Sequence, residues 1–358
     1  MSIMIKLSIL AVLATVLLSP MTSASLLADS TQTPTEVPDG NPPGKFLQRT
    51  DVRDFLDELS QSSGLDRNRL AGIMSRATYQ QAVIDAISRP AERTLTWAQY
   101  RPIFLKQKRI DQGQEFMSEH AELLERARQT YGVPPAIITA IIGVETFYGR
   151  ITGKYDVLDS LSTLGFDYPP RAEFFRKELG EFLILAENEG WDVHQRQGSY
   201  AGAMGVPQFI SSSYQQYAVD FDNDGKRDLF NSIADVIGSV ANYFSIHGWV
   251  EGAPVADRWE FDGAIPDAVS TLVQSSLSPA VTAQGVSALG FRSDKLQAGT
   301  ADERLLSVMV LDGADGEEAW VGYQNFYVIT RYNHSRLYAM AVLQLAQNID
   351  STLAQSDP

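Results

Sequence analysis

Residues 135–149 read PAIITAIIGVETFYG, and this stretch decides what kind of fold the chain can adopt. Pro135 suits the first turn of a helix, where a missing N–H group costs little. With about 100° between successive residues, isoleucines and a valine occupy one arc of that helix, and Glu145 falls inside the arc. We expect Gly149 to end the helix and to leave room for a ligand.

A carboxylate within an apolar helix face must be desolvated or must line a cleft cut into the core. Desolvation raises the pKa of a carboxyl group, so Glu145 is expected to hold its proton more tightly than an exposed glutamate. A carboxylic acid that stays protonated near neutral pH can protonate a glycosidic oxygen. The alternative is a structural role, in which Glu145 caps a neighbouring helix or pairs with a buried arginine.

Helical periodicity dominates the chain on both sides of this stretch. Apolar residues recur every three to four positions, and several of these segments are followed by a glycine that can end a helix. The segments cover residues 52–59, 123–127, 174–186, 233–244 and 335–346. They predict a mainly α fold of the α+β kind, built around a helical body.

The pattern changes after about Pro254. Leu305 to Leu311 is a short apolar run closed by the turn signal Asp312-Gly313. Alternation along residues 326–330 (FYVIT) predicts another strand. We therefore expect a small β-rich region late in the chain. The sequence contains no internal repeat, P-loop or dinucleotide-binding fingerprint.

Composition excludes several classes of function. The chain has 358 residues, 29 basic and 44 acidic side chains, a formal charge of −15 and no cysteine. Its length predicts two or three domains, and 44% hydrophobic residues suffice for a sizeable core. Without cysteine there are no disulfides, thiolate metal sites, cysteine nucleophile or lipid-modified cysteine. The acidic charge argues against binding nucleic acid or an anionic lipid surface.

Residues 1–24 have the pattern of a cleaved secretory signal peptide. Lys6 precedes an apolar run from Leu7 to Leu18, and small residues occupy positions 22–24. An uncleaved anchor is the alternative, but about a dozen apolar residues fall short of the roughly 20 that span a bilayer. The Ser-, Thr-, Pro- and Gly-rich composition of residues 25–45 predicts a disordered linker. We expect an exported, periplasmic protein without a membrane anchor.

Residues 220–225 read DFDNDG, which matches the opening of an EF-hand calcium loop. Asp220, Asp222 and Asp224 would supply the first ligands. Asp228 falls at the ninth position, and the twelfth holds asparagine instead of glutamate. The alternative is a solvated acidic turn. Four histidines without paired spacing predict no zinc site.

Four ordered motifs resemble the membrane-bound lytic murein transglycosylase B family, which is glycoside hydrolase family 103. They are GVETFYG (143–149), SYAGAMGVPQF (199–209), GSVANY with HGW (238–249) and NFYVITRYN (325–333). The resemblance runs from about residue 46 to residue 349. It implies a lysozyme-like helical core, a flanking helical domain and a small β-rich domain.

The domain boundaries follow from the same resemblance. The helical domain would cover residues 46–130, completed by a C-terminal helix at 333–352. The lysozyme-like catalytic core would cover residues 131–252 with the EF-hand-like loop at 220–235. The β-rich domain would cover residues 253–332.

The resemblance also implies lytic transglycosylase activity. Such an enzyme cleaves the β-1,4 bond between N-acetylmuramic acid and N-acetylglucosamine in peptidoglycan and forms a 1,6-anhydromuramoyl end without water. Glu145 would be the single acid/base. Most glycosidases use two carboxylates, for which Asp156, Asp159 and Asp167 are candidates by sequence. A muramidase that uses water and a non-catalytic peptidoglycan-binding or scaffold protein are the alternatives.

Further site residues are implied one by one. Ser199 matches a serine that holds the muramic 2-acetamido group, with a local turn bond as the alternative. Arg171 matches one of two adjacent arginines that meet a substrate carboxylate; Pro170 stands at the other position, so half of that pair is missing. The other matches line the sugar groove, although each tyrosine outside this family context would be interpreted as a core aromatic. They are Tyr100, Gln208, Tyr243, Tyr332, Asn333 and Tyr338.

In the family the calcium loop is longer, and Asp235 fits its last acidic ligand. Ser232 and Asp235 also form a capping-box pattern, which is the rival role. A bound Ca²⁺ would be structural, and catalysis would need no cofactor. Peptidoglycan glycan strands are the expected partner of a monomeric enzyme. The sequence leaves open other cell-wall enzymes as partners, endo or exo cleavage, and the need for stem peptides.

Overall fold

The computed structural model describes residues 45–88, 95–273, 276–296 and 304–351. The predicted signal peptide, and the predicted linker apart from Lys45, lie outside these residues. Within the described ranges no helix is both long enough and apolar enough to cross a membrane.

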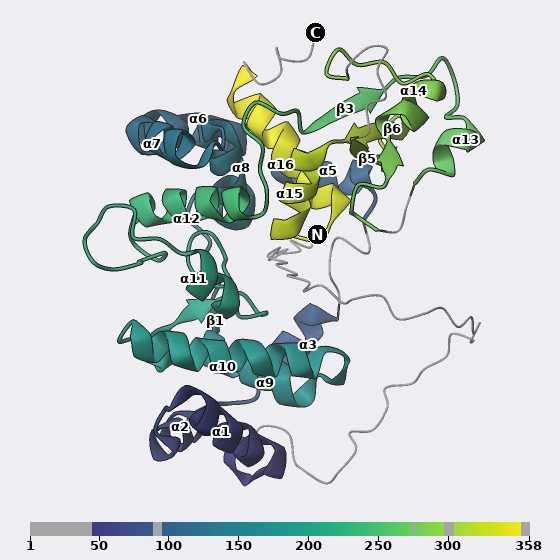
Figure 1. Cartoon of the computed structure of the whole chain (residues 1–358). Coiled ribbons are helices and arrows are strands. Elements are labelled where there is room, and N and C mark those ends of the chain that lie inside the picture. Colours follow the sequence, from purple (N-terminus) through teal and green to yellow (C-terminus); the bar gives the residue numbers. More distant parts are fainter. Residues whose placement is uncertain (1–44, 89–94, 274–275, 297–303, 352–358) are drawn as a thin grey trace, which may run out of the picture.

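The described chain is mainly α, as predicted, with one small antiparallel sheet and a two-stranded ribbon (Figure 1). The α-helices are α1 (Thr50–Ser63), α2 (Arg67–Met74), α3 (Gln81–Ile87), α5 (Trp97–Phe104), α6 (Gln107–Glu119), α7 (Ala121–Tyr131), α8 (Pro135–Thr146), α9 (Val157–Asp167), α10 (Ala172–Asn188), α11 (Ser211–Tyr217), α12 (Ile233–Ile246), α13 (Asp267–Ser270), α14 (Ala283–Ala288), α15 (Gln324–Tyr332) and α16 (Arg336–Ile349). Short 3-10 helices are η1 (Phe46–Gln48), η2 (Pro169–Arg171) and η3 (Val193–Gln195). The strands are β1 (Tyr155–Asp156), β2 (Gln197–Gly198), β3 (Ala256–Trp259), β4 (Val281–Thr282), β5 (Leu305–Gly313) and β6 (Gly316–Gly322).

Helix α8 lies at the centre of the helical body. Every residue from Ala136 to Thr146 is buried, so the helix is enclosed on all sides and not along one arc only. A helix that is apolar all round is stable only where neighbours cover it completely. Helices α6, α7, α12 and α16 provide that cover (Figure 1).

The end of α8 differs from the expectation that Gly149 would terminate it. The helix ends at Thr146, and Phe147 and Tyr148 take left-handed conformations with φ of 52° and 60° before Gly149 at 80°. Two hydrogen bonds hold this turn: the Tyr148 N–H donates to the carbonyl of Ile142 (3.2 Å), and the Gly149 N–H donates to Thr146 Oγ1 (3.0 Å). These bonds move the helix end ahead of the glycine that usually marks it.

The predicted strand at residues 305–311 is confirmed as part of β5. The sheet has the order β3-β6-β5-β4, and all its pairs are antiparallel. Because Gly313 pairs with Gly316, the hairpin turn is formed by Ala314 and Asp315, just beyond the predicted Asp312-Gly313 signal. One face of the sheet covers a second, smaller apolar core that includes Trp259 and Phe291.

The strand predicted at residues 326–330 is wrong, because this segment belongs to helix α15. Its buried positions include Asn325, Val328, Ile329 and Tyr332, which share one helix face, whereas Tyr327 is only half-buried. The β-branched and aromatic residues that suggested a strand pack instead against the main core and α16. Packing therefore overrides the local strand preference.

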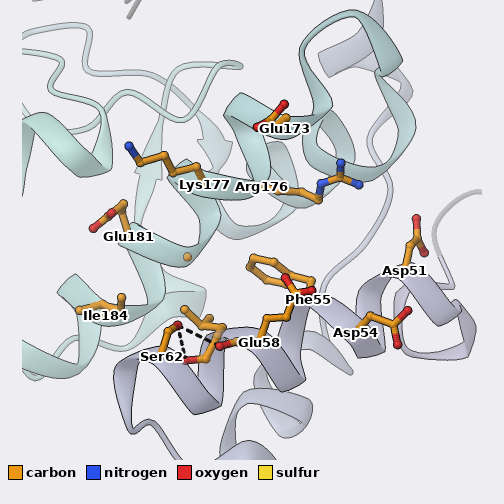
Figure 2. A pocket seen from close by; sticks show the side chains of 12 residues that line it. Asp51, Asp54, Phe55, Glu58, Ser62, Glu173, Arg176, Lys177, Glu181 and Ile184 are labelled. Atoms are coloured by element: carbon orange, nitrogen blue, oxygen red, sulfur yellow. Dashed lines mark hydrogen bonds between the residues drawn. The ribbon is translucent and has the colours of Figure 1, made fainter.

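A hollow of about 600 Å³ opens between α1 and α10 (Figure 2). Phe55 lies between the two helices, and charged side chains of both signs, including Glu58, Arg176 and Lys177, stand around it. Glu145 is not among the residues that line this hollow, so the hollow is separate from the predicted acid.

Candidate active site

Glu145 lies in the last turn of α8, and its side chain meets a tyrosine from the far end of the chain. Only 5% of Glu145 is exposed. Tyr338, in the first turn of α16, donates its hydroxyl proton to Glu145 Oε1 at 2.6 Å. Ser335 caps α16 by accepting a bond from the Tyr338 N–H (3.3 Å), which fixes where the helix begins and so where Tyr338 lies. The packing of α16 on α8 therefore orients the carboxyl group.

Two tyrosines remain protonated beside this carboxyl group. Burial, and then the charge of Glu145, raise the pKa of Tyr338 well above its ordinary value. The same two causes raise the pKa of Tyr332. Tyr100 on α5 lies close enough to contribute to the shift of Tyr338. At neutral pH these phenols can donate hydrogen bonds but cannot carry charge, so Tyr338 is a fixed donor to the carboxyl group.

An aromatic wall extends from Tyr332 to helix α12. The rings of Tyr332 and Tyr243 lie with centroids 4.8 Å apart, and Phe209 lies within 6 Å of both. The Tyr332 hydroxyl donates to the carbonyl of Pro207, and the Tyr243 hydroxyl donates to the carbonyl of Arg331, each at 2.6 Å. Both hydroxyls thus hold the structure together, and the rings supply apolar surface.

The loop between β2 and α11 carries Ser199. Its Oγ accepts bonds from the backbone N–H groups of Ala203 (3.0 Å) and Ala201 (3.3 Å), so the local turn bond proposed as the alternative is present. Both bonds use the oxygen as acceptor, and a hydroxyl can still donate its proton. Gly205 lets the loop pack tightly, because a Cβ there would lie 2.5 Å from the Leu229 carbonyl oxygen.

Gln208, on the same loop, has a strained backbone and an unsatisfied oxygen. Its φ is 54°, and its Nε2 donates to the carbonyls of Thr152 (3.0 Å) and Gly205 (2.8 Å). Within the described structure its buried Oε1 accepts no hydrogen bond. A buried acceptor without a donor is costly, so this oxygen is suited to a ligand or water donor.

The structure brings the remaining predicted residues near this centre to different degrees. Asn333 directly follows Tyr332 and is buried. Arg171 lies further out, with its guanidinium carbon 4.3 Å from the ring centroid of Phe174. Phe174 in turn packs against the small cluster of Ala203 and Ile210, which belong to the loop that carries Ser199. Arg171 is therefore linked to this loop indirectly, because Phe174 contacts both.

The other candidate carboxylates have structural partners. Asp156 caps α9 by accepting from the Asp159 N–H (3.3 Å). Asp159 accepts from the backbone N–H of Thr78 (2.8 Å), and Asp167 forms an ion pair with Arg49. These contacts give each of the three a role in the fold.

The acidic loop brings together part of the predicted ligand set. Carboxylate oxygens of Asp220, Asp222 and Asp235 lie within 4.8 Å of one another. Asp235 accepts from the N–H groups of Phe221 (2.7 Å) and Asp228 (2.8 Å), so its carboxylate faces the loop. Three carboxylates at this separation repel one another unless a cation or a proton is present.

Two other predicted ligands instead bond to nearby backbone. Asp224 accepts from the N–H of Lys226 (2.8 Å), and Asp228 accepts from the N–H groups of Phe230 and Asn231. Neither belongs to the group formed by Asp220, Asp222 and Asp235.

Thr146 is a site residue that the sequence reasoning missed. Its Oγ1 donates to the carbonyl of Val206 (2.9 Å) and accepts from the Gly149 N–H, so it joins the end of α8 to the loop of Ser199 and Gln208. The signal in the sequence was a threonine directly next to Glu145, in a helix whose other residues are almost all apolar.

A buried carboxyl group that accepts a bond from a tyrosine, beside an aromatic wall in a helical body, fits a lysozyme-like, glycan-cleaving class of enzyme. The sequence matches the Transglycosylase SLT domain family over residues 47–347, and the chain belongs to this family.

Known relatives agree with this family. The chain is 40% identical over 324 residues to the membrane-bound lytic murein transglycosylase B of Escherichia coli (strain K12), covering 86% of this chain and 84% of the relative. The crystal structure of the soluble lytic transglycosylase SltB1 from Pseudomonas aeruginosa matches with a TM-score of 0.78 and 48% identity, covering 85% and 99% of the two chains. The Escherichia coli lytic transglycosylase Slt35 in complex with calcium matches with a TM-score of 0.76 and 39% identity, covering 87% and 96%. The protein is therefore a peptidoglycan lytic transglycosylase with a lysozyme-like fold.

Proposed function

We propose that this enzyme cleaves the β-1,4 bond between N-acetylmuramic acid and N-acetylglucosamine with Glu145 as the single acid and base. The observation that carries this proposal is the buried carboxyl group of Glu145, held by the Tyr338 hydroxyl at 2.6 Å. A desolvated carboxyl group can keep the proton that the leaving oxygen needs.

The proposed reaction returns the enzyme to its starting state. Glu145 gives its proton to the glycosidic oxygen as the bond from that oxygen to C1 of the muramic residue breaks. The C6 hydroxyl oxygen of the same residue then bonds to C1, and its proton passes to Glu145. No water is consumed, because the nucleophile belongs to the substrate. One carboxyl group can therefore serve both steps, where most glycosidases need two.

Other residues are proposed to hold the sugars. Ser199 would donate to the 2-acetamido carbonyl of the muramic residue, and Gln208 Oε1 would accept from a sugar hydroxyl or amide. Arg171 would meet a carboxylate of the lactyl group or stem peptide at the edge of the site. The groove itself would be lined by polar side chains and aromatic faces that suit sugar hydroxyls and C–H patches. These residues are Tyr100, Tyr243, Tyr332, Asn333 and Tyr338.

A structural Ca²⁺ is proposed in the acidic loop. Asp220, Asp222 and Asp235, whose carboxylate oxygens already lie close together, would be the first ligands. Asp224 and Asp228, on the same loop, would be the further ligands. The relative Slt35 has been solved in complex with calcium. The ion would stabilise the loop and take no part in the reaction.

The remaining proposals concern organisation and location. We infer a periplasmic protein that is exported by residues 1–24 and continues through a linker to residue 45. The helical domain would span residues 46–130 with 333–352, the catalytic core 131–252 and the β-rich domain 253–332. The Escherichia coli relative is described as membrane-bound, whereas this chain has no cysteine to carry a lipid anchor.

Glu145→Gln tests the proposed acid. Glutamine keeps the shape of the side chain but cannot donate or accept the reaction's proton, so cleavage of purified peptidoglycan should fall at least roughly 10²–10⁴-fold. Binding of the variant to peptidoglycan in a pull-down should persist. Glu122→Gln, at an exposed glutamate of α7, is the control and should cleave normally. Cleavage by folded Glu145→Gln near the wild-type rate would refute the assignment.

A further inference from the structure

The left-handed turn that follows Glu145 needs support from outside the helix. Phe147 and Tyr148 both have positive φ, which is unfavourable for residues with a Cβ atom. Such conformations persist where surrounding contacts enforce them, often beside active sites. The contacts of Tyr148 therefore show what holds this turn in place.

Tyr148 fills a slot between α6 and α8 that two glycines make possible. A Cβ on Gly143 would lie 2.7 Å from the Tyr148 ring, and one on Gly113 would lie 2.4 Å from the Tyr148 hydroxyl. The ring is buried and stacks at a tilt on Phe116, with centroids 5.7 Å apart. Its hydroxyl donates to the carbonyl of Arg109 in α6 at 2.8 Å.

Tyr148 is tied to the last turn of α8 as well as to α6. Its backbone N–H donates to the carbonyl of Ile142 at 3.2 Å, and its ring lies against Gly143, two residues before Glu145. The last turn of α8 is thus held from α6 through Tyr148. Tyr338 holds the carboxyl group itself from α16.

We propose that Tyr148 is a positioning residue for Glu145, and that Gly113 and Gly143 are glycines because the slot must admit its ring. This inference rests on the proposed role of Glu145 as the acid. If the ring is displaced, the left-handed turn and the last turn of α8 shift together. Glu145 then meets the glycosidic oxygen in a poorer geometry, while the sugar groove on the other elements still binds. A displacement of about 1 Å can lower a rate roughly 10²-fold.

Gly113→Ala tests the proposal without touching the site. The added methyl group would collide with the Tyr148 hydroxyl, so kcat on a soluble peptidoglycan oligosaccharide should fall about tenfold or more, with KM within about twofold. Gly72→Ala is the matched control, because Gly72 is also helical and has nothing within 4 Å of an added Cβ. That variant should keep kcat and KM.

Tyr148→Phe removes the atom with which the methyl group collides. This variant alone should lower kcat only a few-fold. The hydrogen bond to Arg109 is lost, but the ring still fills the slot. Combined with Gly113→Ala it should restore kcat to the level of Tyr148→Phe. The methyl group would also meet Ile349 Cδ1 at 2.5 Å. Tyr148→Phe cannot relieve that contact, so recovery assigns the effect to Tyr148.

The outcomes separate this inference from the proposed function. If Gly113→Ala keeps kcat within twofold, Tyr148 does not position Glu145. If Gly113→Ala does not fold, or if the double variant shows no recovery because Ile349 is displaced, kcat of Tyr148→Leu decides: an unchanged kcat leads to the same conclusion, and a loss of about tenfold or more supports the positioning role. Glu145→Gln is assayed in parallel. Activity in Glu145→Gln overturns the proposed function, whereas an inactive Glu145→Gln beside a fully active Gly113→Ala overturns the positioning role alone.

Discussion

At the scale of single residues, the hydroxyl of Tyr338 gives Glu145 an orientation that burial alone would not provide. A buried carboxyl group in an apolar cavity can rotate, and only a directional bond selects one rotamer. Tyr338 is suited to this because its raised pKa keeps it a donor across the working pH range. Glu145 accepts that bond through Oε1, so its orientation depends on helix α16.

Tyr338→Phe tests this orientation. It removes the hydrogen bond that orients Glu145 and keeps the ring, so kcat should fall up to about tenfold, since a hydrogen bond between neutral groups is worth roughly 0.5–1.5 kcal/mol. Steady-state kinetics on a soluble oligosaccharide would measure the loss. Tyr214→Phe is the control, because that buried hydroxyl bonds to the Arg227 carbonyl beside α11. Equal kcat in wild type and Tyr338→Phe would contradict the account.

At the scale of elements, sequence periodicity located the long helices, and it failed where packing decided the structure. The stretch FYVIT at residues 326–330 alternates like a strand but lies in α15, because its apolar side chains pack against α16 and the main core when the segment is helical. The end of α8 was also misplaced, since hydrogen bonds to Thr146 and Ile142 are invisible in local propensity. Boundaries set by tertiary contacts cannot be derived from a local pattern.

The β-sheet is held to its neighbouring loop by a buried ion pair. Asp257 in β3 accepts bonds from Lys295 Nζ (2.5 Å), Ser293 Oγ (2.7 Å) and the Tyr323 hydroxyl (2.6 Å). Burial alone would raise the pKa of Asp257, but these three donors outweigh it and hold the pKa below its ordinary value. Tyr323 directly precedes α15 as its N-cap residue, so the cluster connects the sheet to the helix that carries Tyr332.

Asp257→Asn should destabilise the protein by about 2–4 kcal/mol, because it removes the negative charge that faces Lys295 in a largely buried place. Thermal unfolding at neutral pH would measure this loss. Because the folded pKa is lowered, the contribution of Asp257 is present above about pH 4 and is lost as the pH falls through the folded pKa. The acid side of the stability profile should therefore be flatter in the variant.

The exposed pair of Arg258 and Glu260 next to it provides a matched control for the Asp257 variant. Glu260→Gln should change stability by less than about 1 kcal/mol, since exposed ion pairs are worth little. If Asp257→Asn has no larger effect than Glu260→Gln, the buried cluster does not stabilise the sheet.

The acidic loop should respond to calcium as a unit. If Asp220, Asp222 and Asp235 bind Ca²⁺, EDTA should lower the melting temperature by a few degrees and added Ca²⁺ should restore it. An ion at about 100 times its Kd contributes roughly 2.7 kcal/mol. Asp220→Asn should abolish the response. If neither EDTA nor Ca²⁺ changes the melting temperature, the loop is a solvated acidic turn without a bound ion.

At the scale of the whole molecule, the site is assembled from segments that are far apart in the chain. Glu145 could be selected from its own helix, because a carboxylate within an apolar run is a local signal. Tyr338, 193 residues away, could be predicted only from the resemblance of the whole chain to a known family, because it lies outside the four motifs. Composition limited the class of protein, but only the packing of α16 on α8 explains why these two residues meet.

The chemistry of the product tests the central claim most directly. Purified peptidoglycan is digested in heavy-oxygen water, and the new glycan ends are analysed by mass spectrometry. Transfer to the C6 hydroxyl predicts anhydromuramoyl ends that are lighter by one water and contain no heavy oxygen. Reducing ends that carry the heavy oxygen would instead make the enzyme a muramidase and would contradict the account.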